Sequence, residues 1–210
     1  MIVAIDGPAG TGKSTIAKLI SKKLHIAFLN SGSFYRGITM ALLDSKIDLD
    51  NKKAVIDFSK KVKMDYVNER LILNGIDVDD HLHDARIDLN AAKVSSIPEI
   101  RDIINKKLRC ITKHLSLVCE GRDMTTVVFP NAEYKFYLDA SLEAQAIRRY
   151  KQNVSDLTLE QIKKEIQERD KIDKNKAVGA LKIAKDANYI DTSDLTIEQV
   201  CEIITSKIHN

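Results

Sequence analysis

The stretch Gly7-Pro8-Ala9-Gly10-Thr11-Gly12-Lys13-Ser14 decides how the rest of this 210-residue chain is interpreted. Two glycines separated by four residues and followed by lysine and serine form the pattern of a loop that cradles phosphate groups. The apolar run Ile2-Val3-Ala4-Ile5 comes shortly before it. Apolar residues then recur at helical spacing at Ile16, Leu19, Ile20 and Leu24. A buried strand, a glycine-rich loop and an amphipathic helix are the context that this motif requires.

The chemistry of the loop predicts a nucleotide site. Glycines let backbone N–H groups approach an anion closely, and the following helix N-terminus adds partial positive charge. Lys13 supplies a full positive charge to the outer phosphates, and Ser14 offers a hydroxyl as a ligand to Mg²⁺. We expect ATP to contact Gly7, Pro8, Ala9, Gly10, Thr11, Gly12, Lys13, Ser14 and Thr15.

Composition places the chain among ordinary globular proteins, with 44% hydrophobic residues. No run approaches the roughly 18 apolar residues of a membrane span. The first residues enter a strand at once, which leaves no room for a signal peptide. The three cysteines form no C-x-x-C pair and are expected to be reduced. A net charge of +3 is too small to indicate nucleic-acid binding. We therefore expect a cytoplasmic protein that binds neither membrane nor nucleic acid.

Strands alternate with helices along the whole chain, which predicts an α/β fold with a doubly wound parallel sheet. Besides the first run, strands are expected at 26–29, 115–119, 134–138 and 189–190. Short strand-like pieces with turn signals at Asn68 and Asn74-Gly75 predict a small antiparallel insertion over about 60–84. Thr158 and Gln161 predict the capping box of a helix over about 159–170. We expect one domain over 1–210, with a helical lid over about 148–178.

Polar residues follow two of these strands, at the sheet edge where ligands bind in open α/β folds. Asn30 to Arg36 come after the second strand, and Glu120-Gly121-Arg122-Asp123 come after the third. Ser31 could cap the next helix or hold a substrate. Arg101 lies off the apolar stripe of its helix, so spacing alone favours a solvated charge.

Three functions are compatible with a phosphate-binding loop: a GTPase or ATPase switch, a nucleotide-binding module without turnover, and a kinase for a small acceptor. The guanine-reading Asn-Lys-x-Asp is absent from the sequence. An acceptor that is itself a phosphate requires cations beyond Lys13, preferably bidentate guanidiniums. Candidates for that role are Arg36, Arg122, Arg148, Arg149 and Arg169. A polar segment at 150–157 could close over the site and exclude water.

The chain resembles bacterial cytidylate kinases over nearly its whole length. Ile5 to Ser14, Ser31 to Arg36 and Ile97 to Arg101 carry the resemblance, together with Glu168-Arg169-Asp170 and Asp173. The run Gly121-Arg122-Asp123-Met124, continued by Val127-Val128-Phe129-Pro130, is very specific to that family. The resemblance implies a P-loop kinase fold and transfer of the terminal phosphoryl group of ATP to CMP or dCMP, with Mg²⁺. It also implies a monomer. A uridylate or shikimate type of kinase is the alternative enzyme.

The resemblance also implies roles for individual residues. Ser31, Arg101 and Asp123 would contact the cytosine, and the Asp123 carboxylate would accept a hydrogen bond from its exocyclic amine. Arg36 and Arg122 would hold the acceptor phosphate. Arg169 and Asp173 would contact the sugar, and Lys176 would stand in the lid. Lys13, Arg122 and Arg169 are the expected catalytic residues.

At several positions the chain departs from the usual family pattern. Asn30 replaces an aspartate, Ala92 a serine, Thr125 a glycine and Ala180 a proline. Lys176 replaces an arginine, which keeps the charge but loses the planar fork.

Overall fold

A computed structural model describes residues 1–151 and 157–208. It divides into two compact units, Met1–Phe28 with Ser116–Asn210, and Leu29–Leu115. Among the described residues, no helix is both long and apolar enough to span a membrane.

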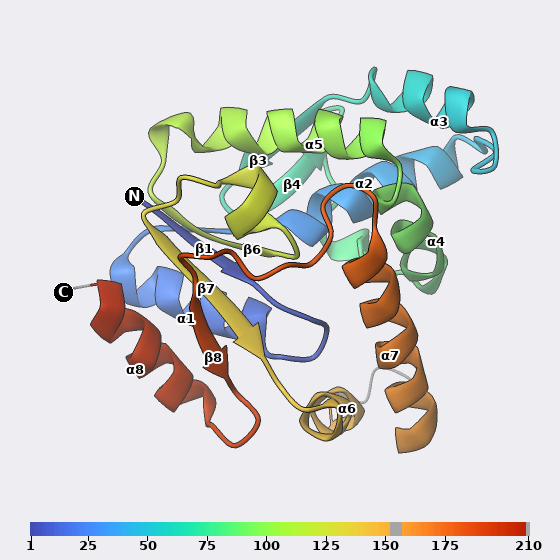
Figure 1. Ribbon diagram of the computed structural model, residues 1–210. Helices are drawn as coiled ribbons and strands as arrows, with labels where there is room; N and C mark the ends of the chain where they lie inside the picture. The colour runs from blue at the N-terminus through green and yellow to red at the C-terminus, as the bar shows by residue number, and fades with distance from the viewer. Residues whose placement is uncertain (152–156, 209–210) are drawn as a thin grey trace. The chain divides into compact units, whose positions relative to one another are not determined.

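The first unit is built on a five-stranded sheet (Figure 1). Its strands are β1 (Ile2–Asp6), β2 (Ala27–Asn30), β6 (Leu117–Gly121), β7 (Tyr134–Asp139) and β8 (Asn188–Asp191), in the order β2-β6-β1-β7-β8. Strand β1 is parallel to both β6 and β7, and β7 is parallel to β8. The chain passes into the second unit within β2. The predicted P-loop kinase fold with a parallel sheet is confirmed.

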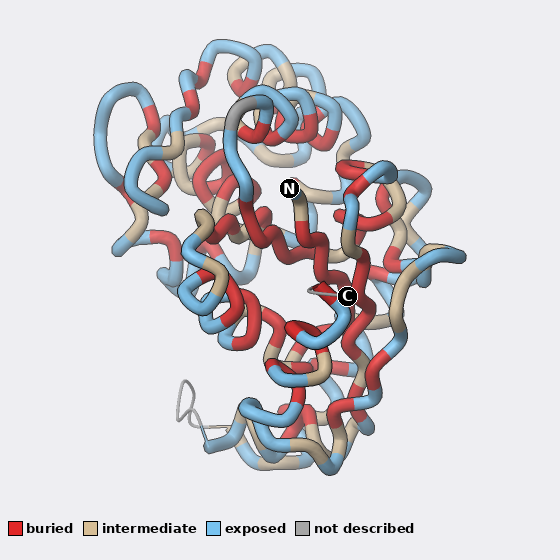
Figure 2. Tube along the Cα trace, turned by 90° about the vertical axis from the view of Figure 1, so that its left-hand side faces the viewer, coloured by how far each residue is buried: buried red, intermediate tan, exposed pale blue. Residues whose placement is uncertain are grey.

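Strand β1 is central because its residues are apolar and buried on both faces, as in parallel sheets. In Figure 2 the chain passes from its N-terminus through a short, partly buried piece into a buried stretch, residues 3–6. Helices α1 (Lys13–Leu24) and α8 (Ile197–Ile208) pack against each other. Their apolar faces join the strands in one core, which includes Ile5, Ile20, Phe136 and Ile204. This core fixes the end of β1, where the glycine-rich loop begins.

Helices α6 (Leu142–Lys151) and α7 (Leu159–Asn175) pack against each other through Ala146, Ile162 and Ile166. The predicted capping box is confirmed, since Thr158 and Gln161 bond each other's backbone N–H groups. Helix α7 continues to Asn175 instead of ending near residue 170. The helix continues because Lys171 and Lys174 have good helix propensity and Asp173 is buried within it. Within the expected lid, residues 152–156 lie outside the described part of the chain.

The second unit combines helices with the predicted antiparallel insertion, which is confirmed. Strands β3 (Met64–Val67), β4 (Arg70–Leu73) and β5 (Ile76–Asp77) form a separate antiparallel sheet. The helices are α2 (Ser31–Asp44), α3 (Lys52–Ser59), α4 (Ala85–Ser95) and α5 (Pro98–Ile111). Helix α2 packs on α4 and β4, and α5 packs on α2, α3, α4 and β3.

Candidate active site

The glycine-rich loop between β1 and α1 needs glycine for two different reasons. A Cβ on Gly7 would lie 2.0 Å from the backbone oxygen of Leu138, so only glycine lets the loop start so close to β7. Gly12 has a φ of 86° and occupies the N-cap of α1. Because glycine brings no capping side chain, the N–H groups of the first turn are left to an anionic ligand.

Lys13 is buried beside the loop, with 6% of its surface exposed. Its Nζ donates a hydrogen bond to the carbonyl oxygen of Pro8 at 2.6 Å. Burial, reinforced by the nearby charges of Arg122 and Arg169, lowers the pKa of Lys13 to about 7 against the opposing effect of Glu120. The charges of the two predicted catalytic arginines, Arg122 and Arg169, therefore act on Lys13, which belongs to the same unit.

Ser14 and Glu120 form the part of the site that suits a divalent cation. The Ser14 hydroxyl donates to Glu120 Oε1 at 2.8 Å, and Glu120 is buried at the end of β6, paired in register with Ile5. A hydroxyl and a carboxylate are hard oxygen donors, and Mg²⁺ takes few protein ligands because it keeps several waters and binds substrate phosphates. These two side chains therefore fit Mg²⁺ carried with a nucleotide.

The end of β1 is tied to the turn that follows β6. The carboxylate of Asp6 is fully buried and accepts hydrogen bonds from the backbone N–H groups of Met124 (2.8 Å) and Thr125 (2.7 Å). It also accepts one from the Thr125 hydroxyl at 2.6 Å. Burial raises the pKa of Asp6 to about 6, although the bonds from Thr125 and Met124 oppose the shift. The turn itself is a single π-helical turn over Met124–Val128, which the sequence did not predict.

Arg122 is held by an ion pair in the first unit. Its Nε donates to Asp173 Oδ2 at 2.8 Å, and Lys176 Nζ donates to the other carboxylate oxygen at 2.7 Å. Although burial alone would raise the pKa of Asp173, the charges of Arg122 and Lys176 lower it to about 2. Lys176, which replaces the usual family arginine, still joins this cluster. Asp173 thus connects the end of α7 to the segment after β6.

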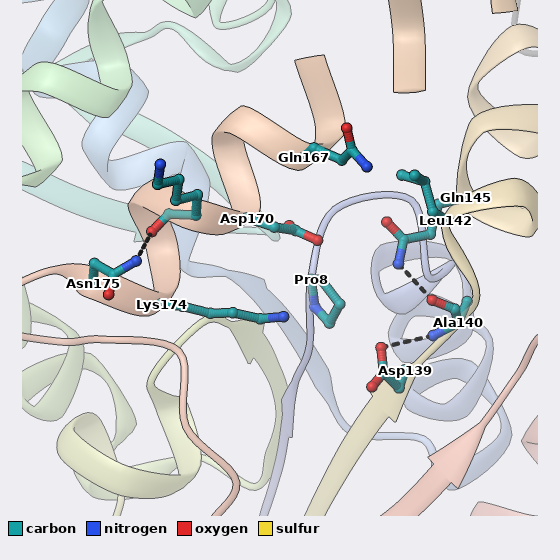
Figure 3. Close-up of a pocket in the computed structure, with 10 residues that line it drawn as sticks. Pro8, Asp139, Ala140, Leu142, Gln145, Gln167, Asp170, Lys174 and Asn175 are labelled. Carbon is teal, nitrogen blue, oxygen red and sulfur yellow. Dashed lines mark hydrogen bonds between the residues drawn. The ribbon is translucent and has the colours of Figure 1, made fainter. Parts of the chain in front are cut away.

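Helix α7 also reaches the phosphate loop directly. Asp170 Oδ1 accepts a hydrogen bond from the Ala9 N–H at 3.4 Å, and burial raises the pKa of this carboxyl. A cavity of about 460 Å³ lies beside this contact. Figure 3 shows that Pro8 of the loop, Asp170 and Lys174 of α7, and Gln145 of α6 border it. The phosphate loop therefore borders open space on the side that α6 and α7 line.

In the second unit, Ser31 is the first residue of α2 and is buried. It does not cap the helix, because the Asn30 side chain accepts the hydrogen bond from Gly32 N at 2.8 Å. The aspartate that is usual in the family could cap the helix in the same way, because both side chains offer an Oδ1 acceptor.

Arg101 corrects the expectation drawn from its spacing. It is 3% exposed, not a solvated charge. Its guanidinium lies 5.2 Å from the centre of the Tyr35 ring, and Nη1 donates to the Ser95 carbonyl at 3.1 Å. A cation over an aromatic ring is stabilised by the ring's electrons, which compensates part of the cost of burial.

Arg36 is half-buried and pairs with a carboxylate of its own unit. Both Nε and Nη2 donate to Asp88 Oδ1 on α4, at 3.2 Å and 2.6 Å. Asp88 is exposed, so this pair is open to exchange with another anion.

Asp6, Glu120 and Asp170 are site residues to which the sequence assigned no role. Asp6 and Glu120 lie at the carboxyl ends of two neighbouring central strands. Because ligands bind at this edge of a parallel sheet, their position in the sequence could have identified them as site residues. Asp170 gave no comparable signal, since its contact depends on how α7 packs against the loop.

Comparisons with known proteins agree with this geometry. The family model described as cytidylate kinase matches residues 3–210. A cytidylate kinase of Borrelia hermsii is 43% identical over 209 residues, covering 97% of this chain and 96% of the relative. One from Fusobacterium nucleatum is 41% identical over 211 residues, covering 99% and 97%. An uncharacterized protein from Eubacterium ventriosum, 12% identical, matches in structure with a TM-score of 0.53 over 100% of this chain and 99% of that one, which concerns the fold alone.

Proposed function

The chain belongs to the cytidylate kinase family, and we propose from this that it transfers the terminal phosphoryl group of ATP to CMP or dCMP. The products are ADP and CDP or dCDP. The observation that carries the proposal is the buried Lys13 at the phosphate loop, on which the charges of Arg122 and Arg169 act, beside the Ser14–Glu120 pair. A lysine at the loop and two arginines whose charges act on it suit a reaction that brings two phosphate groups together.

On the donor side, we assign the ATP phosphates to the backbone of residues 7–15 and to Lys13. Lys13 would exchange its bond to the Pro8 carbonyl for one to the outer phosphates, and their charge would restore its ammonium form. Ser14 and Glu120 would hold Mg²⁺, which supplies charge neutralisation of the phosphates when bound.

On the acceptor side, the cytosine is assigned to Ser31, Arg101 and Asp123. Asp123 is 1% exposed, and a buried carboxylate that accepts from the exocyclic amine of cytosine would reject uracil, which lacks that amine. The phosphate is assigned to Arg36 and Arg122, and the sugar to Asp173 and Arg169, with Lys176 supporting Asp173.

In the transfer step, an oxygen of the acceptor phosphate forms a bond to the terminal phosphorus of ATP. The bond from that phosphorus to the bridging oxygen of ADP breaks, and its electrons leave with ADP. No general base is needed because the acceptor phosphate is already anionic. Arg122 and Arg169 neutralise the charge on the oxygens around the transferring group.

Product analysis over a panel of acceptors tests the proposal. ADP formation is measured with CMP, dCMP, UMP, AMP, GMP, shikimate and no acceptor, and the products are identified. We expect equal amounts of ADP and CDP or dCDP. ADP formed without an acceptor would indicate an ATPase, and a faster reaction with another acceptor would assign the enzyme to that substrate. We further propose that the protein acts as a cytoplasmic monomer without nucleic acid.

A further inference from the structure

The turn after β6 is anchored to the carboxylate of Asp6, a contact that the proposed reaction does not use. Of the hydrogen bonds that Asp6 accepts, two come from backbone N–H groups and one comes from the Thr125 side chain. Any residue other than proline at position 125 could supply its N–H. The third bond requires a hydroxyl.

The anchored turn lies immediately after the residues assigned to CMP. Arg122 and Asp123 precede Met124, and the backbone oxygen of Asp123 accepts from the N–H groups of Val127 (2.9 Å) and Val128 (3.1 Å). A displacement of Thr125 is therefore transmitted through the turn to Asp123. Asp6, in turn, is the last residue before the phosphate loop, so its carboxylate ties the two loops of the first unit together.

Thr125 is built into this contact. Thr125 is 1% exposed, and its Oγ1 donates a hydrogen bond to Asp6 Oδ2 at 2.6 Å. The backbone N–H of Thr125 donates to the same oxygen. Hydrogen bonds to a charged, buried acceptor are stronger than neutral ones and more costly to remove. The neighbouring Thr126 provides a contrast, because its buried hydroxyl has no hydrogen-bond partner among the described residues.

We propose that Thr125 is a positioning residue for the acceptor nucleotide: its hydroxyl, bonded to Asp6, fixes the turn that orients Asp123 and Arg122. The inference rests on the proposed function, since it assumes that Asp123 and Arg122 bind CMP. Glycine, which the family usually has here, would keep the N–H bond and lose the hydroxyl.

Steady-state kinetics of three variants test the inference, with CMP and ATP varied separately. Thr125→Val removes the hydroxyl and nearly conserves volume, Thr125→Ser restores it, and Thr126→Val is the matched control. We expect Thr125→Val to raise the KM for CMP about tenfold and to change the KM for ATP much less, since loss of a bond to a charged group costs at least that factor. Thr125→Ser and Thr126→Val should stay close to the parent enzyme.

A thermal unfolding scan of each variant separates positioning from stability. If Thr125→Val lowered the melting temperature and left the KM for CMP unchanged, Thr125 would be structural only and the inference would be wrong. The same would follow if Thr126→Val raised the KM for CMP equally. Should Thr125→Val not fold, Thr125→Gly provides the same comparison. If calorimetry showed that the parent protein binds CMP but the assay showed no phosphorylation, the proposed function would be wrong. The role of Thr125 would then be tested by comparing the CMP affinities of the variants.

Discussion

The two units of this protein hold their arginines in different ways. In the first unit, Arg122 is bonded to a buried carboxylate, and its charge acts on the buried Lys13. In the second unit, Arg101 is held by an aromatic ring and a backbone carbonyl, while Arg36 pairs with the exposed Asp88.

This difference indicates what an anion would have to do in order to bind to each unit. Around the phosphate loop, the charges of Arg122 and Arg169 act on the buried Lys13, so an incoming phosphate relieves repulsion that is already present. In the second unit Arg101 and Arg36 already have partners within their own unit, and a ligand must replace them. Substitutions in the first unit should therefore have larger effects than those in the second.

The largest effect is expected from Lys13→Ala. Removing the buried cation at the phosphate loop should lower kcat by roughly a thousandfold, since one such electrostatic contact contributes about that much. A coupled ADP-release assay measures the loss, and circular dichroism checks the fold. Lys22→Ala, which removes an exposed lysine from the same helix, is the control and should leave kcat unchanged. A kcat for Lys13→Ala within tenfold of the parent, roughly, would contradict the role.

The next largest effect concerns base recognition by the first unit. Asp123→Ala should reduce kcat/KM for CMP by about a hundredfold, the cost of losing a charged hydrogen bond in a buried site, with little change in the KM for ATP. Rates with UMP should fall far less, because uracil has no exocyclic amine to lose. Equal losses for CMP and ATP would refute the assignment of Asp123 to the base.

Proton uptake on ATP binding tests the electrostatics around Lys13. With a pKa of about 7 in the free protein, Lys13 is largely neutral at pH 8, and the phosphates should raise its pKa and return the proton. Calorimetric titrations in two buffers of different ionisation enthalpy should show uptake approaching about one proton per ATP at pH 8, and less at pH 6. Binding enthalpies that are independent of the buffer at pH 8 would exclude a neutral Lys13.

The smallest effect is expected in the second unit, from Asp88→Asn. The exposed pair with Arg36 contributes little stability, and weakening it should free Arg36 for the acceptor phosphate. The KM for CMP should fall by about twofold to fivefold at low ionic strength, and the effect should vanish at high salt. A rise in the KM would mean that Asp88 helps to orient Arg36 for the substrate.

The sequence predicted the fold well because the phosphate loop is one continuous stretch. The strand and the helix beside it are also recognisable from the spacing of their apolar residues. The residues from 7 to 15 could be assigned without knowing any long-range contact. Arg101 could not, because the ring of Tyr35 that accommodates its charge comes from another helix. Ser31 needed the structure to show that Asn30, one residue earlier, caps α2.

The carboxylates were harder still to interpret from sequence. Asp173 was assigned to a nucleotide's sugar from the family pattern alone, and its pairing with Arg122 spans 51 positions of sequence. The Asp6–Thr125 contact joins residues 119 positions apart, so only the parallel pairing of β1 and β6 brings them together. Local patterns carry no signal for such pairs.

A dinucleotide that joins adenosine to cytidine through a chain of phosphates tests most directly the claim that ATP and CMP meet with their phosphates together. Its affinity, measured by calorimetry with Mg²⁺, should exceed that of ATP and that of CMP, and both Lys13→Ala and Arg122→Ala should weaken it. Binding no tighter than that of ATP alone, or insensitivity to Arg122→Ala, would contradict the account.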